Sequence, residues 1–325
     1  MTISFIIGGG VALEPPGLAL HERYQVMRDW SDQVVRWSGL TLDQLYTEDL
    51  SVHLYDGDDS ARPELRHLAA ARQAMLAIGI ADVLAEQGIR PNLLGGSSLG
   101  WMICSCLAGA ISREDLFAML KFNSRQPMSP PGEPGRGFAV AIIEADADLD
   151  WYCGPDRPGV YFASDVGGRF ADGKYQMVMF SGKLDALREL AAEAPRGQLN
   201  VLSVLGGGHT PLQEYYAGLV RPYLEKIPFR DPELPVVSAL TKGAAVTTAE
   251  GVRAEFAANL TTPAYLSHVK QGLAERGTEL ALLLGAGVPV ALFAWPYPTL
   301  SVSSPEEIEQ AAATVYDMGI ELTFN

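Results

Sequence analysis

Cysteine and positive charge are both scarce in this chain of 325 residues. The three cysteines, Cys104, Cys106 and Cys153, cannot all pair and are too few for a disulfide framework, so a reducing cytoplasm fits best. The spacing of Cys104 and Cys106 is wrong for a zinc site, and we expect both to be small residues of the core. The sequence implies no metal and no redox cofactor.

Basic residues are outnumbered, with 24 Lys and Arg against 39 Asp and Glu and a formal net charge of −15. This charge repels nucleic acid and anionic membranes, so neither is an expected partner. The first residues lack the basic lead of a signal peptide, and residues 1–7 are typical of a first strand. Glycines and a proline interrupt the longest charge-free run, 280–293, whose apolar pieces are shorter than the roughly 20 residues of a membrane span.

Hydrophobic residues make up 48% of the chain, which is enough for a substantial core. Apolar residues recur at steps of three or four over 68–86, which predicts a helix, and a short strand at 92–94 follows. Helix, strand, glycine-rich turn and helix in this order are typical of a parallel α/β sheet covered on both faces. The alternation resumes late in the chain, with expected helices at 212–224 and 266–275 and expected strands at 236–240 and 280–284.

The middle of the chain has a different pattern after a stretch rich in proline and glycine, residues 127–137. Its expected elements are a strand at 138–143, a helix at 146–152, strands at 160–163 and 176–180, a helix at 184–192 and a strand at 201–205. This βαββαβ order matches the split ferredoxin-like plan. The sequence therefore predicts a large α/β subdomain, residues 1–130 and 206–325, with a ferredoxin-like subdomain, residues 131–205, inserted in it. We expect the ligand site in the cleft between them.

The pentapeptide Gly96-Ser97-Ser98-Leu99-Gly100 lies between the 92–94 strand and a predicted helix over 99–110. Gly-x-Ser-x-Gly at such a place is the pattern of a nucleophile elbow, whose serine occupies a sharp turn that the glycines let neighbouring backbone approach. The helix that follows would direct its free N–H groups at an oxyanion forming near Ser98. By itself the pentapeptide is equally compatible with an ordinary glycine-rich turn.

A serine nucleophile needs a base, and histidine suits that role near neutral pH. His209 follows a predicted strand and three glycines, and it precedes a helix start marked by Thr-Pro. The other four histidines are expected on the surface or on a predicted helix: His21, His53 and His67 among polar residues, and His268 beside Lys270. We therefore expect Ser98 and His209 to act as a pair.

Six segments carry a wider pattern: Arg72-Gln73-Ala74-Met75, Gly96-Ser97-Ser98-Leu99-Gly100, Ala110-Ile111-Ser112-Arg113-Glu114-Asp115-Leu116, Val178-Met179-Phe180-Ser181-Gly182, Gly208-His209-Thr210-Pro211-Leu212 and Asn259-Leu260-Thr261-Thr262-Pro263. In order and rough spacing the chain resembles malonyl-CoA:acyl carrier protein transacylases and polyketide synthase acyltransferase domains. The resemblance covers nearly the whole chain. It implies a hydrolase-like α/β body with a ferredoxin-like insert, in agreement with the order of elements above. In character the chain is most similar to discrete aminoacyl or dipeptidyl carrier-protein acyltransferases of macrolactam pathways.

The resemblance also implies roles for individual residues. Ser98 would be acylated by a thioester donor, with His209 as general base and then general acid. Main-chain N–H groups of Leu99 and Gly9 would form the oxyanion hole, and the main-chain carbonyl of Asn259 would hold the imidazole. Gly9 stands where the family usually has glutamine, a change that keeps the main-chain donor. Substrates would arrive as phosphopantetheine or coenzyme A thioesters, with no bound cofactor and no metal.

Two positions depart from the malonyl-type members. Asn123 stands where those members place an arginine that grips the substrate carboxylate, and Gly208 stands where they carry phenylalanine. Together the changes imply a pocket for a larger acyl group without a carboxylate. Gln73 and Trp101 are also expected to line this pocket, although core packing explains Trp101 equally well.

We therefore expect an acyltransferase that moves a bulky or amino-acid-derived acyl group onto or between acyl carrier proteins in polyketide biosynthesis. Three alternatives stay open: an editing thioesterase with the same Ser/His pair, a malonyl-CoA:acyl carrier protein transacylase, and a carrier-protein binder without activity. Carrier proteins are usually acidic, so a rim of basic residues is expected on or beside the insert. Its candidates are Arg125, Arg136, Arg157, Arg169 and Lys174.

Overall fold

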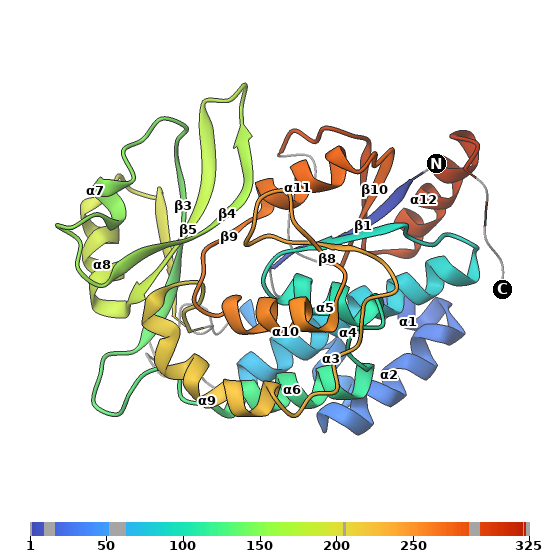
Figure 1. The fold of residues 1–325 in the computed structure, drawn as a ribbon, viewed down its shortest axis with the longest axis horizontal. Helices are drawn as coiled ribbons and strands as arrows, with labels where there is room; N and C mark the ends of the chain where they lie inside the picture. Colours follow the sequence, from blue (N-terminus) through green and yellow to red (C-terminus); the bar gives the residue numbers. More distant parts are fainter. Residues whose placement is uncertain are drawn as a thin grey trace.

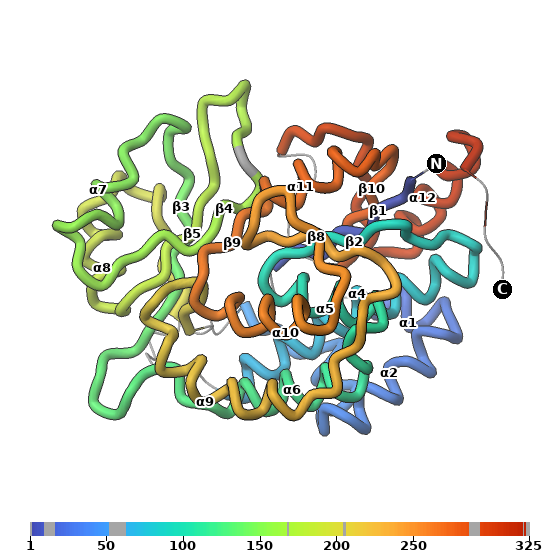
Figure 2. Tube along the Cα trace, in the orientation of Figure 1, coloured from blue at the N-terminus to red at the C-terminus, as the bar shows by residue number. Residues whose placement is uncertain are grey.

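Two β-sheets organise the protein in a computed structural model, which describes residues 2–9, 17–51, 63–203, 206–285, 293–320 and 322 (Figure 1). The larger sheet has the strand order β11-β10-β1-β2-β7-β8, and the smaller has the order β6-β3-β5-β4-β9. The chain enters the smaller sheet after α6 and returns to the large body through α9 (Figure 2). The fold class is therefore the predicted one, a parallel α/β body with an inserted ferredoxin-like subdomain.

The strands of the larger sheet are parallel except at one edge, where β8 runs antiparallel to β7. They are β1 (Ile3–Ile7), β2 (Leu93–Gly96), β7 (Val236–Val237), β8 (Ala245–Val246), β10 (Leu280–Leu284) and β11 (Thr299–Val302). Every residue of β1 and β10 is buried, because helices cover both faces of the sheet. Burial on both faces explains the continuous apolar sequences of these two strands. The strand predicted at 280–284 is confirmed, and that predicted at 1–7 is confirmed over Ile3–Ile7.

Helices pack on both faces of the larger sheet. They are α1 (Leu18–Arg23), α2 (Gln25–Ser38), α3 (Leu42–Tyr46), α4 (Pro63–Glu86), α5 (Leu99–Leu107), α6 (Arg113–Arg125), α9 (Glu214–Leu224), α10 (Ala249–Ala258), α11 (Leu266–Glu275) and α12 (Pro305–Asp317), with a short 3-10 turn, η2 (Pro211–Gln213), before α9. Phe5 and Ile7 of β1 join the core cluster with α4 and α5, whereas Ile6 joins the cluster with α11. Alternate residues of the strand thus bind helices on opposite sides.

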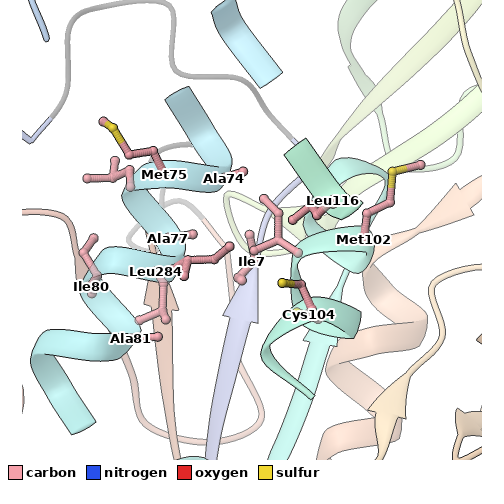
Figure 3. Packing of buried hydrophobic residues seen from close by; sticks show 14 of the residues in the cluster. Ile7, Ala74, Met75, Ala77, Ile80, Ala81, Met102, Cys104, Leu116 and Leu284 are labelled. Carbon is pink, nitrogen blue, oxygen red and sulfur yellow. The ribbon is translucent and has the colours of Figure 1, made fainter. Parts of the chain in front are cut away.

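The central helix α4 is buried on nearly all sides. Its alanines face Ile7 of β1 and Leu284 of β10, so the helix lies close to the sheet (Figure 3). Among the described residues, α4 is also the helix long and apolar enough to cross a membrane, but 83% of its most apolar window is buried inside the protein. The apolar surface of α4 is therefore explained by its place in the core.

The smaller sheet is built from β3 (Arg136–Glu144), β4 (Val160–Phe170), β5 (Tyr175–Lys183) and β6 (Leu199–Leu202), which pair antiparallel with one another. Two helices, α7 (Asp150–Cys153) and α8 (Leu184–Glu193), complete its βαββαβ order, and Leu187 and Leu190 of α8 pack in its core. A strand from the large body, β9 (Ala264–Tyr265), adds to its edge parallel to β4. The boundaries 1–130, 131–205 and 206–325 stay a prediction.

Several of the expected elements differ in length from the observed ones. β4 continues to Phe170 instead of ending at 163, and α7 is a single turn where a helix over 146–152 was expected. The strand expected at 236–240 ends after Val237, because the Ser238 hydroxyl accepts hydrogen bonds from the main-chain N–H groups of Leu240 and Thr241 and turns the chain.

Polar contacts tie the two sheets together beside the cleft. Asp165 of β4 accepts hydrogen bonds from the main-chain N–H of Ser267, at 3.1 Å, and from its hydroxyl. Lys270 donates to the main-chain oxygen of Gly167 at 2.8 Å. Because Ser267 and Lys270 both lie on α11, this helix fixes the position of β4 against the large body.

Candidate active site

Ser98 lies at the turn between β2 and α5 in a backbone conformation that residues with side chains rarely adopt. Its φ is 57° and its ψ is −123°. A Cβ on Gly100 would lie 2.0 Å from the main-chain oxygen of Ile7, and one on Gly96 would lie 2.5 Å from the carbonyl carbon of Gly100. Both glycines are therefore needed for the elbow, which presents the Ser98 hydroxyl at the N-terminus of α5.

The imidazole of His209 lies between Ser98 and a main-chain carbonyl. Nε2 is 2.7 Å from Ser98 Oγ, and Nδ1 is 3.3 Å from the main-chain oxygen of Thr262. Because a carbonyl only accepts, Nδ1 carries the proton, and Nε2 is left to accept from the Ser98 hydroxyl. The main-chain N–H of His209 donates to Leu260 at 2.9 Å, which holds the residue at its positive φ of 59°.

Two main-chain carbonyls act on the imidazole of His209, the expected one of Asn259 and that of Thr262, which the sequence did not predict. The 3.3 Å hydrogen bond is the one to Thr262, three residues later. Asn259 is the C-cap of α10, and its carbonyl has a smaller effect on the pKa of His209 than that of Thr262. Both belong to the turn that follows α10.

Burial controls the protonation of His209. The side chain is 6% exposed, and loss of hydration lowers its pKa from 6.5 to about 4, while the Thr262 and Asn259 carbonyls act in the opposite direction. The imidazole is therefore neutral at pH 7 and can accept a proton. Within the described part of the chain its hydrogen-bond partners are a hydroxyl and main-chain carbonyls, not a carboxylate.

The two residues expected to form an oxyanion hole both adjoin Ser98. Leu99 is the first residue of α5, where a main-chain N–H has no acceptor within the helix. A Cβ on Gly9 would lie 2.9 Å from both the Ser97 oxygen and the Ser98 Cβ, so the backbone of Gly9 passes against the elbow. Leu99 and Gly9 also line the same cavity. Their role in stabilising an oxyanion stays a prediction.

A cavity of about 430 Å³ opens at Ser98 and His209, between the large body and the smaller sheet. Its lining comes from α4, α5 and α6 on one side and from β3, β4, β5 and β6 on the other. Most of that lining is apolar and includes Met102, Leu120, Met128, Phe138, Val140, Met179, Leu202 and Leu260. The cavity is therefore where the sequence placed the ligand site, in the cleft between the subdomains.

Of the four expected pocket residues, Asn123 and Gly208 line the cavity, whereas Gln73 and Trp101 do not. Trp101 is 2% exposed, and its ring packs edge-on against Phe256 with centroids 5.3 Å apart. Trp101 lies on the core side of α5, whereas Leu99 and Met102, three residues apart, present the other face to the cavity. Gln73 is fully buried in α4 and lies beside Gly285.

Gly208 does not leave the open space that a glycine at this position predicted. A Cβ at this position would lie 3.0 Å from the Cζ of Phe138, which projects from β3 into the cavity. An aromatic ring therefore stands beside the base although the preceding residue is glycine. Phe138 thus takes the place of an aromatic residue at position 208. This follows from the packing of β3 against the segment before His209, which the sequence does not show.

The cavity also contains a charged residue that was not predicted. Arg66 of α4 lines it, close to Asn123, Ser124 and Tyr216. No motif marks Arg66, because its position depends on how α4 packs against α6. One signal was available: an arginine in a mostly apolar helix is expensive to bury without a role.

The five docking candidates differ in how free their side chains are. Arg136 is 5% exposed and binds the Leu212 carbonyl and Glu133, so its side chain is structural and the prediction for it is wrong. Arg157 pairs with Glu193 at 2.6 Å and lies over the Trp151 ring. The remaining three, Arg125, Arg169 and Lys174, are exposed.

Other titratable residues lie in the core. His67 was expected on the surface but is 8% exposed, and its Nε2 lies 3.1 Å from the Ser38 oxygen. His53 lies outside the described residues. Cys104 and Cys106 are buried, as predicted, and burial raises the pKa of both thiols, that of Cys106 to about 12. Across the described ranges, no three His, Cys, Asp or Glu side chains gather as a metal would require.

Curated proteins with similar sequences are polyketide synthases and a transacylase, although no family model matches the chain. "Spectinabilin polyketide synthase system protein NorB" of Streptomyces orinoci is 27% identical over 96% of this chain, and the match spans 14% of that protein. "Malonyl CoA-acyl carrier protein transacylase" of Bacillus subtilis is 24% identical over 84% of this chain and 86% of the relative. "Non-reducing polyketide synthase tpeB" of Talaromyces stipitatus is 26% identical over 60% of this chain, and the match spans only 8% of that protein.

Solved structures with the same fold include malonyl transacylases. The Synechocystis sp. PCC 6803 malonyl-CoA:ACP transacylase has a TM-score of 0.77 at 16% identity, covering 95% of this chain and all of that one, 100%. A malonyl-transacylase solved with a type II polyketide synthase acyl-carrier protein has a TM-score of 0.78 at 18% identity, covering 97% and 100%. These likenesses establish the fold, and the sequence matches support the malonyl-CoA:ACP transacylase and polyketide synthase acyltransferase family for this chain.

Proposed function

We propose that the protein is an acyltransferase that carries an acyl group on Ser98 and passes it to an acyl carrier protein in polyketide biosynthesis. The observation that carries the proposal is the 2.7 Å contact between Ser98 Oγ and the neutral Nε2 of a buried His209. A base held this close can take the hydroxyl proton as the oxygen attacks.

The first half-reaction forms the acyl-serine ester. Ser98 Oγ bonds to the thioester carbonyl carbon while its proton moves to His209 Nε2. The negative charge that develops on the carbonyl oxygen would face the main-chain N–H groups of Leu99 and Gly9. The carbon–sulfur bond then breaks, and the departing thiolate takes the proton from His209. The imidazole is neutral again when the ester is complete.

The second half-reaction reverses these steps with a new thiol. A phosphopantetheine thiol gives its proton to His209 as its sulfur attacks the ester carbonyl, and the carbon–oxygen bond to Ser98 breaks. His209 returns the proton to Ser98 Oγ. Water in place of the thiol would give a free acid instead, which is the editing thioesterase alternative.

The cavity supports an acyl group without a carboxylate. It is largely apolar, and it has asparagine where malonyl-type members would hold a carboxylate with arginine. We therefore propose a bulky or amino-acid-derived acyl group, in keeping with the resemblance to aminoacyl and dipeptidyl carrier-protein acyltransferases. A malonyl-CoA:acyl carrier protein transacylase is the second candidate, because the Bacillus subtilis relative, which matches over most of both chains, has that name.

The proposed partner is an acyl carrier protein, acting as donor, acceptor or both. One relative of the same fold was solved in complex with such a protein. Of the basic residues first considered, Arg125, Arg169 and Lys174 have exposed side chains that can meet an acidic partner. Reversing the charges of Arg125 and Lys174 together should slow transfer to the carrier protein but not the reaction of Ser98 with a small thioester. Equal loss of both rates would refute this docking assignment.

Intact-mass measurements on the purified protein with acyl-loaded carrier proteins test the function. We expect a covalent acyl adduct on the wild-type protein, followed by transfer to a second carrier protein. Ser98→Ala should form no adduct, and Ser105→Ala, a buried serine of the same helix, is the matched control. Release of the acyl group as free acid would indicate the thioesterase. Absence of any adduct would overturn the proposal.

A further inference from the structure

One wall of the cavity carries a cationic donor among apolar side chains. Arg66 of α4 donates through Nη2 to the main-chain oxygens of Ser124 and Gln126, the latter at 3.0 Å. Its guanidinium therefore lies at the C-terminal end of α6. Nε is buried without a hydrogen-bond partner, and no carboxylate within the described residues forms an ion pair with Arg66.

An acceptor without a partner lies in the same wall. Asn123 of α6 is 9% exposed, and its side-chain Oδ1 is buried with no hydrogen-bond partner. Its main-chain oxygen is already used, because it accepts from the Tyr216 hydroxyl at 3.0 Å and from the Gln126 N–H at 3.2 Å. These bonds fix the backbone of Asn123 while its side chain remains available to a ligand.

The bonds of Arg66 limit the ligand it can bind. Arginine binds a carboxylate with two parallel N–H groups, either those of Nε and Nη2 or those of Nη1 and Nη2. Each pair needs a proton on Nη2. The two Nη2 protons are already donated to Ser124 and Gln126, so neither pair is available to a carboxylate. Single donors on Nε and Nη1 remain, which suit one carbonyl oxygen. The positive charge also disfavours an ammonium group on the acyl chain.

We propose that Arg66 and Asn123 form a recognition site for an amide group within the acyl chain. The amide carbonyl accepts a hydrogen bond from Arg66, and the amide N–H donates one to Asn123 Oδ1. A neighbouring donor and acceptor in an apolar cavity match an amide better than a carboxylate, an amine or a hydrocarbon. The inference rests on the proposed function and narrows its substrate to acyl groups with a carbamoyl amide, because the C=O and N–H of a trans peptide amide point in opposite directions and cannot both bind one wall.

Three thioesters of equal chain length, ending in a carbamoyl, a carboxylate or an isopropyl group, test this site. The rate of Ser98 acylation by each is followed by intact mass. We expect the wild-type protein to prefer the carbamoyl chain over its isopropyl isostere by about tenfold or more, since leaving the site's polar groups unpaired is costly. Arg66→Met and Asn123→Leu should each reduce that ratio toward one.

Arg221→Met is the matched control, because Arg221 lies on the same helix as Tyr216, α9, but not in the cavity wall, and its ratio should equal that of the wild type. Arg66→Met loses the hydrogen bonds to Ser124 and Gln126 and could therefore unfold. Asn123→Leu keeps those bonds, so it tests the site in that case. Preference for the carboxylate, or an unchanged ratio in the variants, overturns the amide site while leaving the acyltransferase intact. Failure of all three thioesters to acylate Ser98 overturns the proposed function itself, and this inference with it.

Discussion

The depressed pKa of His209 makes the pH dependence of acylation a sharp test of the site. Burial lowers this pKa to about 4, so the imidazole stays neutral well below the usual titration range of histidine. At pH 5, a group with a pKa of 4 is about 90% neutral, whereas an ordinary histidine is only about 3% neutral. The rate of Ser98 acylation by a small thioester should therefore change little between pH 7 and pH 5 and fall only below that.

The same shift predicts a loss of stability in acid. The unfolded chain binds a proton at His209 below pH 6.5, whereas the folded chain does not until about pH 4. The contribution of neutral His209 to the free energy of unfolding is thus complete above pH 6.5, and it is lost as the pH falls toward 4. Between pH 7.5 and 4.5 the free energy of unfolding should decrease by roughly 2–3 kcal/mol from this residue alone.

Urea denaturation of the wild-type protein and of His209→Gln at both pH values isolates the effect. The variant lacks the titrating group, so its loss of stability in acid should be smaller by roughly 2–3 kcal/mol than that of the wild type. An equal loss in the two proteins, together with an acylation rate that halves near pH 6.5, would show that the imidazole is hydrated and not buried against Ser98.

Two further predictions concern the glycines of the site. Gly100→Ala should destabilise the protein by about 3 kcal/mol in urea denaturation, because its Cβ meets the backbone of Ile7, which cannot move aside. Gly218→Ala, in the exposed interior of α9 with open space around it, should instead stabilise by about 0.5–1 kcal/mol, and a similar effect at both sites would contradict the elbow geometry. Gly208→Ala should slow acylation by bulky thioesters, since the new methyl displaces the Phe138 ring, and Phe138→Leu in the same protein should restore the rate.

Elements whose burial shows in the local sequence were predicted well. The continuous apolar runs of β1 and β10 indicate strands covered on both faces, and α11 begins and ends at the predicted residues, 266 and 275. The two-residue strands β8 and β9 could not be predicted, because pairing with distant partners fixes them and local preference does not.

The candidate site divides in the same way. Ser98 and His209 each lie in a short motif whose glycines reflect close backbone contacts, so the sequence carries their signal. Arg66 and Phe138 reach the cavity only through the packing of α4 and β3, and Trp101 turns to the core because Leu99 and Met102 occupy the cavity face of α5. A residue's neighbours across the fold, which the sequence does not show, determine these three positions.

The short strand β9 couples the insert to the catalytic base. It pairs with β4, and it begins only two residues after Thr262, whose carbonyl orients the His209 ring. A hinge motion that swung the insert away would pull on this turn and misalign the imidazole. We therefore expect acyl chains of different sizes to be accommodated by rotamer changes of the methionines that line the cavity, with the β4–β9 amides staying protected from hydrogen exchange throughout turnover.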